Sequence, residues 1–201
     1  MATSRLETFR DGVFAIAATL LILDVRTTGE PLGHELLHVW PSYAAYAISF
    51  LTIGIIWVNH HNVFSLIGAV DRRFLFMNVF FLMAVAFIPF PTNLVAEHVR
   101  GGGADARDAA LAYGFTFTTM AIGFGMIWLY AAEAGGRLLR HDADARAVQG
   151  ITRSILPGTI AYLSATLIAY ASPVASISLY AAIALFYVLE SSLFAASGNP
   201  A

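Results

Sequence analysis

Long apolar runs alternate with short polar connections along almost the whole chain. A bilayer core about 30 Å thick needs about 20 mostly apolar helical residues, because each residue adds about 1.5 Å. Runs of this kind predict six membrane-spanning helices, at about residues 9–26, 38–60, 74–96, 109–132, 151–171 and 174–196. We therefore expect an all-α integral membrane protein in which residues 1–201 form a single six-helix transmembrane domain.

Two features of this pattern refine the helices. The first run is short for pure hydrocarbon and extends into its polar ends, and the third contains Pro89 and Pro91, which predict a kink or an end there. The connections at Arg72–Arg73 and at Ser172–Pro173 are short, so each joins two antiparallel neighbours.

The arginines predict the orientation in the membrane, because basic residues are retained on the cytoplasmic side. With the N-terminus inside, eight arginines fall on the inner side and three on the outer side. The inner ones are Arg5, Arg10, Arg72, Arg73, Arg137, Arg140, Arg146 and Arg153. We therefore expect both termini in the cytoplasm.

Composition removes several classes of protein. The chain is 58% hydrophobic and 12% charged, against about a quarter charged in a soluble domain. It has no cysteine, which excludes disulfides and thiolate metal sites. A net charge of −2 without any basic run gives no support for nucleic-acid binding. Asp24-Val-Arg26 stands where a signal peptide would have a small-residue cleavage site, so we expect the first run to be a retained helix.

The densest polar cluster lies at the start of the first helix. Arg5, Arg10 and Asp11 need partners at a membrane boundary, and anchoring by snorkelling arginines with a local ion pair would supply them. At about 100° per residue, the side chains of Ile16, Leu20 and Leu23 share one face, and Asp11 projects about 140° away from Ile16. Lipid contact or helix packing is the usual role of such an apolar face.

The same stretch resembles a known family. Arg5, Phe9 and Asp11 are in register with the Arg-x-x-x-Phe-Ser-Asp signature of the transmembrane protein 175 family, which comprises endosomal and lysosomal potassium channels and smaller prokaryotic relatives. Trp57 and His60 match a Trp-x-x-His pattern late in the second helix. Chain length and the six-helix plan are also similar.

Two positions depart from the family pattern. Arg10 replaces the serine of the signature, and Ala18 replaces a common isoleucine two positions after Ile16. The hydrogen bond that the serine makes is therefore not carried over to this chain.

The resemblance implies a homotetramer whose first helices surround a central pore in a bacterial inner membrane. The constriction would be formed by Ile16, Leu20 and Leu23, with Thr19 beside them. A narrow apolar ring makes a cation shed water, which favours potassium ions over sodium ions. Passive conduction needs no catalytic residue and no cofactor, so we expect a channel in the lipid bilayer rather than an enzyme.

Further polar residues are candidates for positioning or for ion capture. His60 is expected to hydrogen-bond to the Asp11 region, together with Asn78, and so to hold the first helix; interfacial snorkelling is the alternative. Asp24 would stand at the outer pore mouth and attract cations, unless it pairs with Arg26.

Two other classes of function remain open from the residues. A proton- or ion-coupled carrier would use Glu190, an acid inside the sixth apolar run, although nearby hydroxyl groups would also satisfy it. A membrane enzyme would need clustered acids, histidines or a nucleophile motif, and none is evident. His34 and His38 have helical spacing but are expected to be solvent-exposed, so no metal site is predicted.

Overall fold

The structure is a computed structural model that describes residues 3–25, 32–133 and 137–197, without the side chains of residues 3–5, 24, 32, 34, 35 and 190–197. The described chain is all-helical, as predicted. Its elements are α1 (Thr3–Leu20), the 3₁₀ helix η1 (Leu21–Asp24), α2 (Leu32–His38), α3 (Trp40–Ser65), α4 (Arg72–Phe87), α5 (Pro89–His98), α6 (Gly103–Glu133), α7 (Ala145–Ile168) and α8 (Pro173–Ser197).

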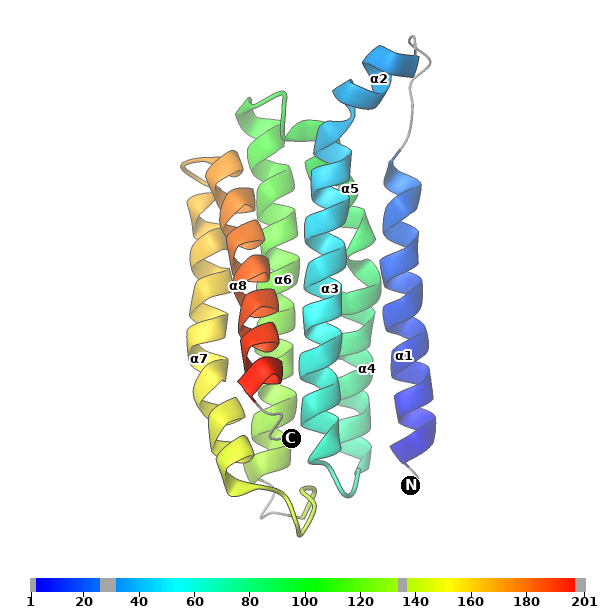
Figure 1. The fold of residues 1–201 in the computed structure, drawn as a ribbon, viewed down its shortest axis with the longest axis vertical. Helices are drawn as coiled ribbons and strands as arrows, with labels where there is room; N and C mark the ends of the chain where they lie inside the picture. The colour runs from blue at the N-terminus through cyan, green and yellow to red at the C-terminus, as the bar shows by residue number, and fades with distance from the viewer. Residues whose placement is uncertain (1–2, 26–31, 134–136, 198–201) are drawn as a thin grey trace.

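The long helices lie side by side in one elongated bundle (Figure 1). Helix α1 forms one edge, α7 and α8 form the other, and α3 to α6 lie between them, while short α2 projects beyond the end of the bundle. The N-terminus lies at the opposite end, together with the connections after α3 and before α7. We call this the N-terminal end of the bundle.

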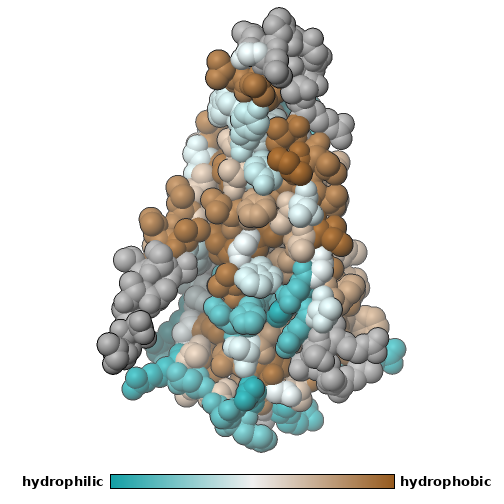
Figure 2. All heavy atoms as spheres, turned by 45° about the vertical axis from the view of Figure 1, so that its right-hand side comes forward, coloured by the Kyte–Doolittle hydropathy of each residue, from teal (hydrophilic) through white to brown (hydrophobic). Residues whose placement is uncertain are grey.

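Within the part of the chain that the structure describes, three segments are long and apolar enough to cross a membrane. They are α3, the continuous segment Arg72–His98 and α6. Figure 2 shows apolar residues over much of the face that carries α1, interleaved with paler ones, and hydrophilic residues gathered toward the N-terminal end. The chain is therefore a membrane protein.

The helix boundaries differ from the apolar runs in an informative way. Helix α4 ends at Phe87 and α5 begins at Pro89, so the expected interruption falls at Ile88, where prolines remove backbone donors. Helices α6 and α7 begin at Gly103 and Ala145, several residues before the runs at 109 and 151. Their first turns are polar, and hydropathy does not detect helix outside the bilayer core.

The connections at the N-terminal end bind to each other. Ile67 and Leu139 form an isolated antiparallel bridge, and the Gly68 N–H donates to the Leu138 carbonyl at 2.9 Å. Asp71 accepts hydrogen bonds from the Phe74 N–H at 2.8 Å and the Tyr130 hydroxyl at 2.6 Å. These bonds hold the pKa of Asp71 below its usual value, so its carboxylate stays charged at neutral pH.

Helices α6 and α7 approach closely at Gly114. A Cβ at this position would lie 2.7 Å from the Thr166 Oγ1 and 3.0 Å from the Thr166 Cα. The glycine therefore permits the contact, as small residues commonly do between membrane helices.

We expect Gly114→Ala to lower the free energy of unfolding by about 1–3 kcal/mol, because the added methyl group overpacks this contact. Gly150→Ala is the matched control, since nothing lies within 4 Å of a Cβ there. Thermal unfolding in detergent should show a lower midpoint for the first variant only. Equal midpoints would show that the contact between α6 and α7 accommodates the added methyl group without loss of stability.

Candidate functional site

Helix α1 has one buried face and one exposed face. Phe14, Ala17 and Leu21 are at most 3% exposed and belong to the core shared with the neighbouring helices. On the other side Ile16 is 61% exposed and Leu23 is 59% exposed. The predicted stripe is thus the face that α1 turns away from its own bundle.

The change from α-helix to 3₁₀ helix after Leu20 keeps Leu23 on the same face as Leu20 and Ile16. In a 3₁₀ helix, side chains three residues apart eclipse each other, so η1 places Leu23 over Leu20. Leu20 is itself 41% exposed and follows Ile16 by four residues on the α-helical part. A bulky apolar residue thus recurs along one line toward the C-terminal end of α1 and η1.

Thr19 is the polar member of this face. It is exposed, and its hydroxyl donates back to the Ala15 carbonyl at 2.9 Å or the Ile16 carbonyl at 3.0 Å. Because the proton is used within the helix, the oxygen lone pairs remain available on the exposed side. An oxygen with free lone pairs is a ligand suited to a cation.

An ion pair between a buried arginine and a half-exposed aspartate lies in the N-terminal half of α1. The Arg10 Nε donates to the Asp11 Oδ1 at 2.9 Å, and the Trp57 indole N–H from α3 donates to the same oxygen at 3.0 Å. The Arg10 side chain is only 3% exposed, and its guanidinium carbon lies 5.4 Å from the Phe64 ring centroid. Charge pairing, a hydrogen bond and a cation–π contact therefore tie α1 to α3.

A second polar pair lies behind the first. The His60 Nε2 of α3 and the Asn78 Oδ1 of α4 are 2.8 Å apart, and both side chains are fully buried. The His60 ring stacks at 4.3 Å on Phe64 and at 5.2 Å on Phe81. This pair joins α3 to α4 at the surface against which α1 packs.

The structure thus brings together most of the predicted signature, with one difference in pairing. His60 bonds to Asn78, whereas Asp11 accepts hydrogen bonds from Arg10 and Trp57. His60 meets α1 through the edge of the Phe14 ring, whose centroid is 5.8 Å away. A histidine surrounded by aromatic rings is shielded from the half-exposed carboxylate.

Arg10 is the residue whose position sequence reasoning missed. The local ion pair expected for the arginines and Asp11 forms, since Arg10 pairs with Asp11, but the Arg10 side chain is buried rather than directed toward water. The signal was its place in the signature, directly before Asp11. An arginine there needs an acceptor and a flat apolar surface, and the chain supplies Asp11 and Phe64.

Several predicted residues are placed only in part. Phe9 is 53% exposed in the N-terminal half of α1. The side chains of Arg5, Asp24 and Glu190 lie outside the described residues, although the backbone places Asp24 directly after Leu23 at the end of η1. Among the described side chains no group of three metal-ligating residues occurs.

Known proteins with similar sequences extend over nearly the whole chain. The family model described as the endosomal/lysosomal potassium channel TMEM175 matches residues 5–89. A potassium channel of Streptomyces collinus is 40% identical over 92% of this chain and 91% of its own length. A potassium channel of Chamaesiphon minutus is 40% identical over 94% of this chain and 95% of its own length.

The fold is also similar to a solved structure. The crystal structure of a lysosomal potassium-selective channel TMEM175 homolog from Chamaesiphon minutus superposes with a TM-score of 0.83. It is 37% identical, and the match covers 94% of this chain and 97% of that one. Identity of this level over almost the full length of its relatives shows that the chain belongs to the TMEM175 family of ion channels.

Proposed function

We propose that this chain is a subunit of a homotetrameric potassium channel that conducts passively between its α1 helices. The relatives that it matches over nearly its whole length are named potassium channels, which supports the conducted ion. The position of α1 at the edge of the bundle supports its place at an axis shared with other copies (Figure 1).

The observation that carries this proposal is the exposed apolar stripe of Ile16, Leu20 and Leu23 on α1. One chain does not close a pore with this face, because α1 turns it away from its own helices. Packing the α1 helices of a homotetramer around an axis would give each stripe residue a ring of equivalent neighbours. Contact with lipid is the alternative role of such a stripe. A lipid-facing helix would not need the polar contacts of Arg10 and Asp11 that fix α1 against α3.

The ring explains a preference for potassium. An apolar constriction offers few oxygen ligands, so a cation must lose part of its hydration shell in order to pass. Potassium loses water at a lower cost than sodium because its charge is spread over a larger radius. The Thr19 hydroxyl oxygens, between Ile16 and Leu20, would replace part of the lost water.

The remaining signature residues would position the pore rather than contact the ion. Arg10, Asp11 and Trp57 hold the inner part of α1 against α3, and His60 with Asn78 stiffens the surface beneath. At the outer end Asp24 would give the tetramer a ring of carboxylates that concentrates cations. Arg5 and Phe9 complete the signature at the inner mouth.

The proposed membrane arrangement has six spans and cytoplasmic termini in the inner membrane of the cell. Consecutive long segments run in opposite directions along the bundle (Figure 1). In chain order these segments are α1, α3, α4 with α5, α6, α7 and α8. Most arginines belong to the N-terminal end or to the polar connections beside it. Conduction breaks no bond, so this function calls for no catalytic residue, cofactor or bound metal.

The reversal potential of purified protein in planar bilayers tests this function. Under a potassium gradient we expect a current that reverses near the potassium equilibrium potential. Replacing potassium with sodium on one side should shift the reversal in the direction of potassium preference. No current from folded, tetrameric protein over a range of voltage and pH would contradict the proposal.

A further inference from the structure

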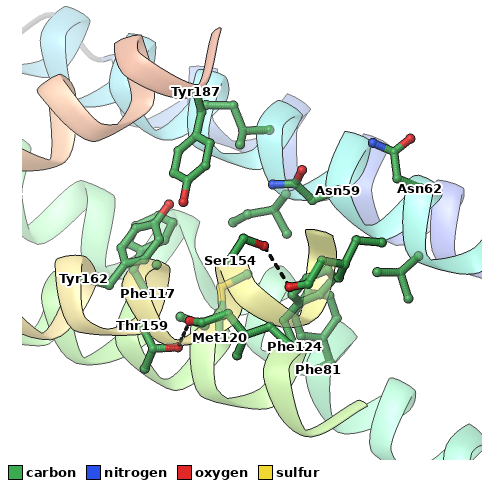
Figure 3. Close-up of a pocket in the computed structure, with 17 residues that line it drawn as sticks. Asn59, Asn62, Phe81, Phe117, Met120, Phe124, Ser154, Thr159, Tyr162 and Tyr187 are labelled. Carbon is green, nitrogen blue, oxygen red and sulfur yellow. Dashed lines mark hydrogen bonds between the residues drawn. The ribbon is translucent and has the colours of Figure 1, made fainter. Parts of the chain in front are cut away.

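A cavity lies on the other side of the bundle from the exposed face of α1. It is enclosed by α3, α4, α6, α7 and α8 and has a volume of about 170 Å³ (Figure 3). An apolar cavity of about 150 Å³ is large enough for a benzene-sized group. None of the α1 residues of the proposed pore lines it.

The local sequence of α7 keeps this space open. Pro157 lies inside the helix and lacks the N–H that would bond to the preceding turn. Gly158 follows and faces the cavity without a side chain, so that a Cβ there would lie 3.3 Å from the Tyr187 hydroxyl oxygen. A larger residue at 158 would fill the space between α7 and α8.

The lining is polar at the mouth and mainly apolar further in, apart from the hydroxyl groups of Thr159, Tyr162 and Tyr187 toward α7 and α8. Asn59 and Asn62 of α3 and Ser154 of α7 are exposed, whereas the lining residues Phe117 and Met120 of α6 are buried. Figure 3 shows the two amides on α3 across the cavity from Ser154. A ligand that fits this gradient has a polar group at one end and hydrocarbon at the other.

The hydrogen-bonding groups narrow the chemistry further. Among the side chains that the structure describes, no charged one lines the cavity, so none of them would hold a bare ion or a phosphate in an apolar surrounding. The Ser154 hydroxyl already donates to the Ile151 carbonyl at 2.8 Å. The Asn59 side-chain amide makes no hydrogen bond within the part of the chain that the structure describes, and its N–H groups suit a neutral carbonyl oxygen.

We propose that this cavity binds one acyl chain of a membrane lipid from the leaflet at the N-terminal end. The ester carbonyl accepts a hydrogen bond from the Asn59 amide, and the hydrocarbon packs on Phe117 and Met120. The charged headgroup stays outside the mouth, in the interface. The bundle surface is membrane-embedded, so acyl chains are the most abundant ligand with this chemistry at this depth.

Photolabelling of the full chain tests this site without reference to ion conduction. Purified protein is reconstituted in vesicles that contain phosphatidylglycerol with a diazirine near the end of one acyl chain, irradiated, digested and mapped by mass spectrometry. We expect labels on residues 117–124 of α6 well above those on Leu156, which is 67% exposed on the outer face of α7. The label at Leu156 measures ordinary lipid contact.

Two variants separate binding from background. Gly158→Leu should reduce the α6 label by about fivefold or more, since the new side chain fills the cavity. Gly150→Leu is the matched control on the same helix, because nothing lies near that position, and it should label as the wild type does. Asn59→Leu leaves the cavity in place and should reduce the label about threefold through loss of one hydrogen bond.

Other outcomes would overturn the site. Labels on residues 117–124 that do not exceed the label at Leu156 would show that no acyl chain enters, whether the space is empty or is filled by another segment of protein. Equal labelling of wild type and a folded Gly158→Leu protein would show that the labels come from elsewhere. If Gly158→Leu fails to fold, an unchanged label in Asn59→Leu overturns the proposed ester contact.

Discussion

Replacing Leu23 with asparagine is expected to lower the potassium-to-sodium permeability ratio about tenfold, because a polar ring keeps water around the ion and removes the dehydration cost. Leu23 is 59% exposed at the end of the α1 stripe, so the substitution leaves the core of the subunit intact. Ile16→Asn should act in the same direction at the other end of the stripe. The ratio is measured from reversal potentials under bi-ionic conditions.

The control for this experiment is an equally exposed leucine away from α1. Leu156 on α7 is 67% exposed, and Leu156→Asn places the same polar group on an exposed face away from α1. Its permeability ratio should match the wild type. If Leu23→Asn and Ile16→Asn both retain the wild-type ratio, the stripe is not the constriction, even if the protein conducts potassium.

Removal of the Asp11 carboxylate is expected to weaken the subunit and its assembly more than it changes ion preference. In Asp11→Ala the buried Arg10 guanidinium loses the acceptor at 2.9 Å, and Trp57 loses its partner at 3.0 Å. A buried cation without its acceptor should lower the free energy of unfolding by about 2 kcal/mol, a value reduced because the carboxylate itself is half-exposed. Chemical denaturation in detergent measures this loss, and size-exclusion chromatography measures the tetramer fraction.

A second neighbouring Arg–Asp pair provides the matched control. The Arg107 Nε lies 3.4 Å from the Asp108 Oδ1, but both side chains are exposed at the start of α6. Asp108→Ala should therefore change stability by less than about 1 kcal/mol. An intact Asp11→Ala tetramer with wild-type stability and altered ion preference would show instead that Asp11 acts in the conduction path.

The long helices of the bundle could be predicted from sequence because a helix that crosses the membrane needs an apolar run of a fixed length. Apolar runs located α3 and α6, and the prolines at 89 and 91 located the break between α4 and α5. The helix ends were less accessible, since the polar first turns of α6 and α7 lie outside the apolar runs. The bridge between Ile67 and Leu139 was not foreseen at all, because it joins two connections that are far apart in sequence.

The candidate site divides in the same way. Helical periodicity placed Ile16, Leu20 and Leu23 on one face, and the family resemblance assigned that face to a pore. Periodicity does not say which face of a helix meets its neighbours, since the opposite face, with Phe14 and Leu21, is also apolar. Packing decided that question when it buried Phe14 and Leu21.

Sequence by itself determined the helical class, the membrane environment, the family and the common face of the α1 stripe, because each depends on local composition or spacing. Tertiary structure alone decided that Arg10 is buried, that Asp11 pairs with Trp57 while His60 pairs with Asn78, and that a cavity opens beside Gly158. These features depend on which side chains from separate helices meet in space. From sequence alone, several side chains could form the same hydrogen bond. Only the close packing of the helices determines which of them does so.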